Sequence, residues 1–372
     1  MSDLAFDQHC MIRALQLARQ GLYTTDPNPR VGCVLAKGGR IIAEGFHARA
    51  GEPHAERHAL AAAGAGARGA TAYVTLEPCS HTGRTGPCAD ALIEAGVVRV
   101  VAAMEDPNPQ VAGNGFSTLR AAGIQVDVGL QESEARALNP GFIRRMRGER
   151  PWVRIKVAAS VDGRTAMASG ESQWITGPEA REDVQRLRAR SSAVITGIGT
   201  VLADRPSYTV RADQWRLGEY GSDQVRQPLR VILDRRLRTP VDVPVVSAAG
   251  PCLVVGGEAH PERQRALEAA GAEVMHLPSS GSGVDLKALL AELSRRECNE
   301  ILVECGATLA GAFVREALFD ELIVYMAPAL LGTDARGLLT LPLVRMAEKV
   351  SLRWADVRQL GNDLRLTLVP GY

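Results

Sequence analysis

The 372-residue sequence contains no run of about 18 apolar residues, the length that a membrane-spanning helix needs. Its first residues, MSDLAFDQHC, also lack the basic start and the apolar stretch of a signal peptide. We therefore expect no membrane partner and a cytoplasmic location.

An excess of charge of one sign is missing too, because 43 Lys and Arg stand against 42 Asp and Glu, for a net charge of +1. This balance argues against nucleic acid as a partner.

Aromatic residues make up only 4% of the sequence, while 46% is hydrophobic and 23% charged, a composition typical of globular rather than disordered or fibrous proteins. Cysteines number seven, an odd and scattered set. Without an export signal, such thiols are more often buried, metal-bound or catalytic than disulfide-bonded. Two of them lie in EPCSHTGRTGPC, residues 77–88. This pair could be a disulfide, two unrelated thiols or half of a metal site.

The length predicts two domains of about 150 residues or more each. Apolar strand-like segments, such as VRVVAAM and LRVILD, alternate with helix-like segments in both halves, which predicts two α/β domains. The segment RRMRGERP, residues 144–151, combines charge, glycine and proline, and we place the boundary there, between residues 1–148 and 149–372. A solvated linker explains its basic charge better than a nucleic-acid site does.

A His-x-Glu pair lies upstream of the two cysteines. Pro53 favours the first turn of a helix, and only at a helix start can His54 and Glu56 reach one site. Each cysteine follows a proline, and Cys88 opens the helix-like segment CADALIEA, where the thiolate is favoured. His54, Cys79 and Cys88 would give Zn²⁺ three ligands and an open fourth position, the arrangement of a catalytic zinc site. Glu56 would move the proton, as in zinc deaminases, although their Cys-x-x-Cys pair is here Cys-x8-Cys.

Each part of this pattern has a less specific explanation. A lone His-x-Glu is most often a surface accident, and scattered cysteines are usually core or free thiols. A structural zinc site would need a fourth ligand, for which His47 and His81 are the candidates. Only the combination of the right order with both prolines favours the zinc deaminase.

The segments HAERHAL, TLEPCSHTGRTGPC, EDPNPQVAGNG and IKVAASVDGRTAMASGESQWITG together resemble the bifunctional riboflavin-biosynthesis deaminase-reductase family. This resemblance covers nearly the whole chain. It implies a cytidine-deaminase-like three-layer α/β/α domain with Zn²⁺, followed by a dihydrofolate-reductase-like α/β domain with NADPH. The implied activities are deamination of 2,5-diamino-6-(5-phosphoribosylamino)pyrimidin-4(3H)-one and reduction of the ribosyl group of the product to ribityl. Phosphoribosyl-pyrimidines are then the small-molecule partners, and we expect a homo-oligomer, a dimer or a tetramer.

The resemblance also assigns residues in the first domain. His54, Cys79 and Cys88 bind Zn²⁺ and Glu56 shuttles the proton. The polar loop between the cysteines holds the ribose-phosphate, and the further contacts come from two Asn-Pro and Asp-Pro segments, for which turn formation is the simpler role. The expected substrate contacts are Asn28, His81, Arg84, Asp106 and Asn108.

In the second domain, ILVECGATLAGAFV indicates a strand that enters a helix through Gly306, where backbone N–H groups can approach phosphate. A plain turn fits this spacing equally well. By the resemblance, the NADPH contacts are Ala158, Trp174, Thr200, Asp204, Gly306, Ala307, Thr308, Leu309, Ala310, Gly311 and Ala312. The substrate contacts are Ser172, Arg188, Tyr208, Arg211 and Glu304.

Lys156 and Glu304 are polar residues on otherwise apolar strands, and we predict that they polarise the ribose group for hydride transfer; a partly exposed salt bridge is the alternative.

Two other functions compete with the family assignment. One is a nucleoside or tRNA-base deaminase with an unrelated C-terminal domain, which would need a basic, aromatic-bearing face. The other is a zinc-stabilised nucleotide-binding or regulatory module without turnover, against which the intact Glu56 argues.

Overall fold

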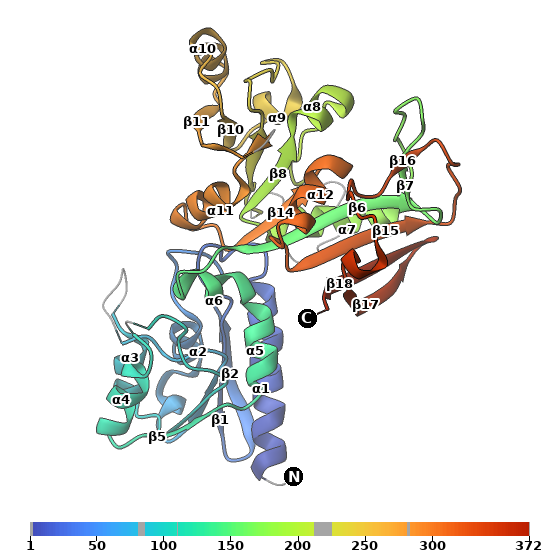
Figure 1. Ribbon diagram of the computed structural model, residues 1–372. Helices are drawn as coiled ribbons and strands as arrows, with labels where there is room; N and C mark the ends of the chain where they lie inside the picture. Colours follow the sequence, from blue (N-terminus) through green and yellow to red (C-terminus); the bar gives the residue numbers. More distant parts are fainter. Residues whose placement is uncertain (1–2, 81–85, 110, 212–224, 281–282, 372) are drawn as a thin grey trace. The chain divides into compact units, whose positions relative to one another are not determined.

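The computed structural model describes residues 3–80, 86–109, 111–211, 225–280 and 283–371. His81 and Arg84, two of the expected substrate contacts, lie outside the described residues. The chain folds as two compact units, Met1–Glu149 and Arg150–Tyr372 (Figure 1). Within the described ranges, no helix combines the length and the apolar character needed to cross a membrane.

The first unit is a five-stranded sheet with helices on both faces. Its strand order is β2-β1-β3-β4-β5, with β1 antiparallel to β2 and β3, and with β3, β4 and β5 parallel. The strands are β1 (Gly32–Lys37), β2 (Arg40–Phe46), β3 (Thr71–Val74), β4 (Arg99–Ala102) and β5 (Gln125–Val128). The helices are α1 (Asp3–Gln20), α2 (Ala55–Ala63), the 3₁₀ helix η1 (Gly64–Ala67), α3 (Cys88–Glu94), α4 (Asn114–Ala121), α5 (Glu132–Leu138) and α6 (Pro140–Met146).

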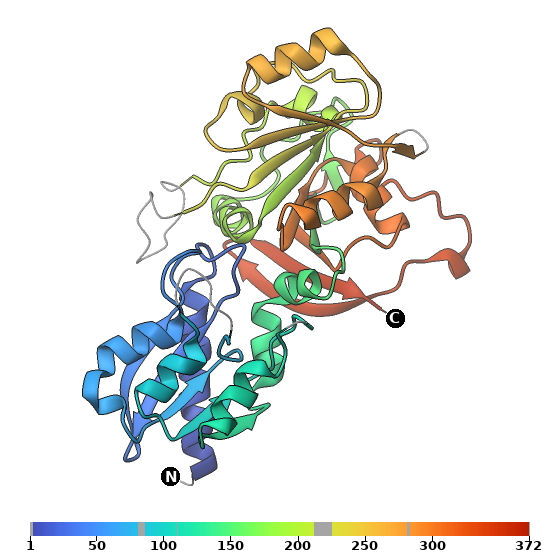
Figure 2. The same ribbon diagram turned by 90° about the vertical axis from the view of Figure 1, so that its left-hand side faces the viewer.

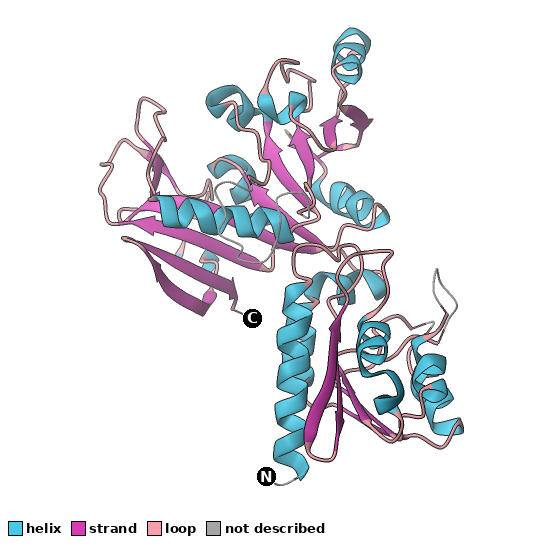
Figure 3. Ribbon diagram, turned by 180° about the vertical axis from the view of Figure 1, so that it is seen from behind, coloured by secondary structure: helices cyan, strands magenta, loops and turns pink. Residues whose placement is uncertain are grey.

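Two glycines let helices pack closely on opposite faces of this sheet. A Cβ atom on Gly32 would lie 2.0 Å from the carbonyl oxygen of Ala14 on α1, and one on Gly45 would lie 2.4 Å from that of Ala55 on α2. Helix α1 runs along one face (Figure 3), and α2, α3 and α4 cover the other (Figure 2). This is the three-layer α/β/α arrangement that was expected.

The second unit is built on a nine-stranded sheet in the order β11-β10-β9-β8-β14-β6-β15-β18-β17. The first seven strands in this order, from β11 at one edge to β15, are parallel. The last two, β18 and β17, are antiparallel to their neighbours and form the other edge of the sheet. Its strands are β6 (Trp152–Ser160), β8 (Ala193–Gly197), β9 (Leu229–Leu233), β10 (Cys252–Gly256), β11 (Glu273–His276), β14 (Glu300–Glu304), β15 (Glu321–Ala327), β17 (Leu352–Leu360) and β18 (Asp363–Pro370).

Short ribbons and helices complete the second unit. The small pairs are β7 (Arg164–Ala166) with β16 (Arg336–Gly337) and β12 (Ser279–Ser280) with β13 (Gly283–Val284). The helices are α7 (Pro178–Arg190), α8 (Ile198–Asp204), α9 (Pro244–Ser247), α10 (Pro261–Ala269), α11 (Leu286–Arg295), α12 (Ala307–Arg315) and the 3₁₀ helix η3 (Met346–Glu348).

Both faces of the parallel part of this sheet are buried, which explains why its strands are almost continuously apolar. On β14, Ile301 and Val303 join one core cluster, and Leu302 joins the other. Helices α11 and α12 cover the first face, and α7 lies across the second (Figure 3). The sheet therefore presents its strand ends, rather than its faces, to ligands.

Candidate metal centre and candidate cofactor pocket

His54, Cys79 and Cys88 form a cluster in the first unit. His54 directly precedes α2, Cys79 follows β3 in the chain, and Cys88 is the first residue of α3. Their potential ligand atoms all lie within 4.8 Å of one another, with His54 Nδ1 at 3.6 Å from Cys79 Sγ and 3.4 Å from Cys88 Sγ. A tetrahedral Zn²⁺ with ordinary bond lengths places nitrogen and sulfur ligands about 3.5 Å apart. The donor set and its spacing therefore fit zinc.

The electrostatics of the cluster suit a metal ligand. The hydrogen bond between the two thiols lowers the pKa of Cys79 and raises the pKa of Cys88, so one thiol of the pair ionises more easily than a free cysteine. Glu56, in the first turn of α2, is only 3% exposed, and this burial raises the pKa of its carboxyl group to about 7. Glu56 and Cys88 are thus buried, whereas His54 and Cys79 are half-buried.

His47, a candidate fourth ligand of a structural site, has other partners. Its Nδ1 lies 3.1 Å from the carbonyl oxygen of Pro53, and its Nε2 lies 3.1 Å from Nδ2 of Asn28. A carbonyl oxygen only accepts, so Nδ1 carries the proton and Nε2 accepts from Asn28. The His47 ring also meets the His54 ring edge-on at 5.3 Å. His47 therefore connects Asn28 to the metal centre without belonging to the three-residue cluster found among the described residues.

Asp106 and Asn108 lie in the loop that follows β4. The carboxylate of Asp106 accepts a hydrogen bond from the backbone N–H of Asn108 at 2.8 Å, the local turn that the sequence left open as an alternative role. The backbone N–H of Asp106 donates to the carboxylate of Glu77 at 3.0 Å. Glu77 precedes Cys79 by two residues, so this loop is tied to the chain of the metal cluster.

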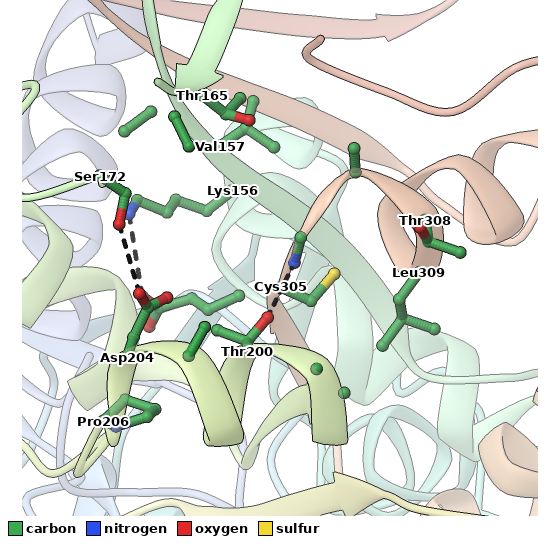
Figure 4. A pocket seen from close by; sticks show the side chains of 18 of the residues that line it. Lys156, Val157, Thr165, Ser172, Thr200, Asp204, Pro206, Cys305, Thr308 and Leu309 are labelled. Carbon is green, nitrogen blue, oxygen red and sulfur yellow. Dashed lines mark hydrogen bonds and ion pairs between the residues drawn. The ribbon is translucent and has the colours of Figure 1, made fainter. Parts of the chain in front are cut away.

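The second unit contains a pocket of about 2440 Å³ (Figure 4). Most of the predicted contacts line it: Lys156, Ala158, Ser172, Trp174, Arg188, Thr200, Asp204, Tyr208, Arg211, Glu304, Gly306, Ala307, Thr308, Leu309 and Ala312. Ala310 and Gly311 are not among its lining residues. Both are buried in α12, and a Cβ atom on Gly311 would lie 2.3 Å from the carbonyl oxygen of Thr340.

Two hydrogen bonds join residues that line the pocket. Ser172 donates a hydrogen bond to Asp204 at the end of α8 at 3.3 Å (Figure 4). The backbone N–H of Gly306 donates to Thr200 Oγ1 at 3.1 Å, so the start of α12 lies beside α8. The resemblance places the cofactor phosphate loop at residues 306–312, which begin at this contact with Thr200.

A charge network of buried and half-buried side chains lines part of the pocket. Lys156 on β6 and Glu304 on β14 are register partners on neighbouring strands, with Nζ and Oε2 3.9 Å apart. Glu304 also accepts hydrogen bonds from Nε and Nη2 of Arg188, at 2.6 and 2.9 Å. The hydroxyl of Tyr208 donates to the carbonyl oxygen of Glu304 at 3.0 Å. The salt bridge named as an alternative role is therefore present, and its acid is only 5% exposed.

Burial and charge act in opposite directions in this network. Burial lowers the pKa of Lys156, although the charge of Glu304 raises it. For Glu304, burial acts to raise the pKa, but the charge and hydrogen bonds of Arg188 prevail and lower it. The site therefore holds an ionised carboxylate and a lysine that is easier to deprotonate than in water.

Sequence reasoning missed a basic rim of this pocket, formed by Arg235, Arg236 and Arg238 after β9. Arg236 and Arg238 are more than half exposed, and Arg235 forms an ion pair with Glu258 at 2.9 Å. The signal was the run DRRLR directly after a parallel strand, since ligands bind at the carboxyl ends of such strands. This cationic rim suits a phosphate-bearing ligand.

Comparison with known proteins covers both units. Residues 151–366 match the RibD C-terminal domain, and residues 4–104 match the cytidine and deoxycytidylate deaminase zinc-binding region. The chain is 52% identical to riboflavin biosynthesis protein RibD of Escherichia coli, over 98% of this chain and 99% of that protein. It is 50% identical to the Haemophilus influenzae protein of the same name, over 97% and 96%.

Solved structures give the same result. The Acinetobacter baumannii RibD structure superimposes with a TM-score of 0.92 at 48% identity and covers 100% of both chains. A Thermotoga maritima diaminohydroxyphosphoribosylaminopyrimidine deaminase/5-amino-6-(5-phosphoribosylamino)uracil reductase matches with a TM-score of 0.85 at 34% identity, over 99% of both. The predicted fold of both halves is confirmed. The alternative with an unrelated C-terminal domain is wrong, because that domain matches the same relatives along its length.

Proposed function

Since this chain belongs to the RibD family of bifunctional riboflavin-biosynthesis enzymes, we propose that its two units carry out two consecutive steps on one phosphoribosyl-pyrimidine. The protein is a deaminase and a reductase that uses Zn²⁺ and NADPH. Residues 1–148 carry the deaminase and residues 149–372 the reductase. The substrates are those in the name of the Thermotoga maritima relative: the diaminopyrimidine is deaminated to 5-amino-6-(5-phosphoribosylamino)uracil, whose ribosyl group is then reduced to ribityl.

The observation that carries the deaminase proposal is the His54, Cys79 and Cys88 cluster with the buried Glu56 beside it. These three residues would hold Zn²⁺, which when bound lowers the pKa of a water molecule to about 7. Glu56 accepts the proton that the attacking water gives up and delivers it to the leaving amine, so that water is consumed and ammonia released. Its burial keeps bulk water from competing for that proton.

Substrate recognition in the first unit is assigned to residues around this cluster. Asn28, whose amide is oriented by His47, presents its remaining amide groups to the pyrimidine. Asp106 and Asn108 approach from the loop after β4, and His81 and Arg84 hold the ribose-phosphate. The proposal for the last two rests on their place between the two cysteine ligands and on the affinity of such side chains for phosphate.

In the reductase, NADPH when bound would supply the hydride for C1′ of the ribosyl group, and the residues of the pocket would deliver a proton to the ring oxygen. Lys156 is the proposed proton donor, since its ammonium lies in the pocket and its pKa is lowered by burial. Glu304, itself held by Arg188, keeps this lysine in place, and both Glu304 and Arg188 bind the substrate. Ala158, Trp174, Thr200 and Asp204 would hold the cofactor, and residues 306–309 with Ala312 would hold its phosphates. Ser172, Tyr208 and Arg211 complete the substrate contacts.

We also propose a homo-oligomer, a dimer or a tetramer, in the cytoplasm. Support for oligomerisation comes from apolar side chains on the edge strands of the second unit: Trp354, Val357 and Leu364 are 65%, 55% and 40% exposed. Exposed apolar groups gathered on one surface are typical of protein interfaces. The reducing compartment is supported by the cysteines, all of which are free thiols.

The test of this division of labour supplies the diaminopyrimidine phosphate with Zn²⁺ and NADPH and measures ammonia release and NADPH oxidation separately. Glu56→Gln should abolish ammonia release, because the proton carrier is lost. The same variant should still oxidise NADPH when 5-amino-6-(5-phosphoribosylamino)uracil is supplied directly. Loss of both activities, or of neither, contradicts the proposal.

A further inference from the structure

Glu77 lies between β3 and the metal cluster and is only 5% exposed. Its carboxylate accepts hydrogen bonds from four backbone N–H groups. Oε2 accepts from Asp106 and Gly113, both at 3.0 Å, and Oε1 accepts from Gly115 at 2.8 Å and Phe116 at 3.4 Å. All four donors are 29 or more residues further along the chain.

These donors belong to two parts of one segment. Asp106 lies in the loop after β4, where its side chain forms the turn with Asn108. The other three donors lie at the start of α4, where the first N–H groups of a helix have no partner within the helix. A carboxylate is suited to this position, because it accepts several hydrogen bonds at once and its charge is stabilised at a helix N-terminus. Glu77 is therefore a remote cap for α4 that also holds the beginning of the preceding loop.

The same contact brings two backbones together. A Cβ atom on Gly115 would lie 2.0 Å from the carbonyl oxygen of Pro78, so α4 touches the chain directly before Cys79. On the far side of Cys79, its sulfur accepts from the backbone N–H of Cys88 at 3.3 Å. Residues 77–79 thus connect the start of α4 to the metal cluster through direct contacts.

We propose that Glu77 is a positioning residue of the deaminase, which holds the substrate loop, residues 106–109, in register with the metal ligand Cys79. This inference rests on the proposed function, because the contact of Asp106 and Asn108 with the pyrimidine is part of that proposal. Glu77 itself touches neither metal nor substrate in this role. Its effect is to keep the loop in the binding-competent conformation before substrate arrives.

The test is Glu77→Gln in the full-length enzyme. Gln has the same shape as Glu, but its NH₂ group cannot accept hydrogen bonds. Because this group would face two of the four N–H donors, two hydrogen bonds are lost. If the loop is ordered in only a fraction of the molecules, the apparent dissociation constant of the substrate equals the intrinsic one divided by that fraction. We expect the KM for the diaminopyrimidine phosphate to rise about tenfold or more, with kcat within about twofold of the wild-type value. Zinc content should stay at the wild-type level.

The controls separate this role from general destabilisation. NADPH oxidation with supplied uracil substrate should be unchanged, since it depends on the other unit. Glu105→Gln makes the same chemical change at an exposed neighbouring position and should leave KM as in the wild type. Loss of zinc from Glu77→Gln, or an unchanged KM, overturns the proposal.

A measurement on the unmodified enzyme keeps the proposal testable even if Glu77→Gln does not fold. The backbone amides of Asp106, Gly113 and Gly115 should exchange hydrogen slowly, although the first two lie outside any helix. Fast exchange at all three overturns the anchor. If the wild-type enzyme releases no ammonia from the diaminopyrimidine phosphate, the proposed function fails, and slow exchange at these amides would still support Glu77 as the loop anchor.

Discussion

The substitution Glu304→Gln removes the negative charge that pairs with Lys156 and Arg188 in the reductase pocket. The side chains of Glu304 and Arg188 are 6% and 13% exposed, and two short hydrogen bonds join them. Breaking a buried ion pair by changing one partner costs about 3–5 kcal/mol, because the remaining charge is uncompensated. Gln keeps the volume and one accepting oxygen. We therefore expect the free energy of unfolding of the second unit to fall by about 2–3 kcal/mol, measured by denaturant unfolding.

The same variant tests the role of Lys156 through the pH dependence of NADPH oxidation. A lysine that donates the proton must be protonated, so activity is lost as the pH rises through its pKa. Burial lowers this pKa, the charge of Glu304 raises it, and Arg188 lowers it. Removing the charge of Glu304 removes the contribution that raises the pKa, and the loss of activity should move to lower pH. Glu262→Gln, an exposed acid on α10, should change neither stability nor pH profile. A profile for Glu304→Gln that coincides with the wild-type profile would refute Lys156 as the donor.

Two further substitutions test other parts of the structure. Arg238→Gln, on the basic rim, should raise the KM for NADPH about tenfold, because one charge-assisted contact is lost to the phosphate that NADPH has and NADH lacks. The KM for NADH and the release of ammonia should stay unchanged. Equal effects on the KM values of both cofactors would contradict this role. Gly32→Ala should lower the free energy of unfolding of the first unit by about 1–3 kcal/mol, since the new Cβ would lie 2.0 Å from the carbonyl oxygen of Ala14. Gly66→Ala, where the nearest atom is 4.0 Å away, is the matched control, and an equal loss of stability in both variants would contradict the packing argument.

The metal cluster was accessible from sequence because its residues are marked by local features. Pro53 and Pro87 each precede a helix start, and these starts hold His54 and Cys88 in the structure. The pairing of Lys156 with Glu304 was accessible for a similar reason, since a charged residue on an apolar strand must find a partner when it is buried. In both cases the chemistry of the side chain and its immediate neighbours in the chain carried the information.

Glu77 has no such local mark. Its partners are backbone N–H groups of residues 106, 113, 115 and 116, and backbone groups are the same in every residue. No pattern of residue types could therefore indicate which distant segment the carboxylate holds. In the sequence, Glu77 is simply part of the motif around Cys79. Only the fold shows that it connects this segment to the loop after β4 and the start of α4.

The prediction for residues 306–312 differs from the structure for a reason that lies in helix geometry. A sequence motif treats such a stretch as one continuous cofactor loop, but from Ala307 onward it is the helix α12. With 3.6 residues per turn, Thr308, Leu309 and Ala312 share one face and line the pocket. Ala310 and Gly311 point away from it, into the core and against the backbone of Thr340. A bound cofactor would therefore meet the first turn and one face of α12, and substitutions at residues 310 and 311 should act on the stability of the second unit before they act on cofactor binding.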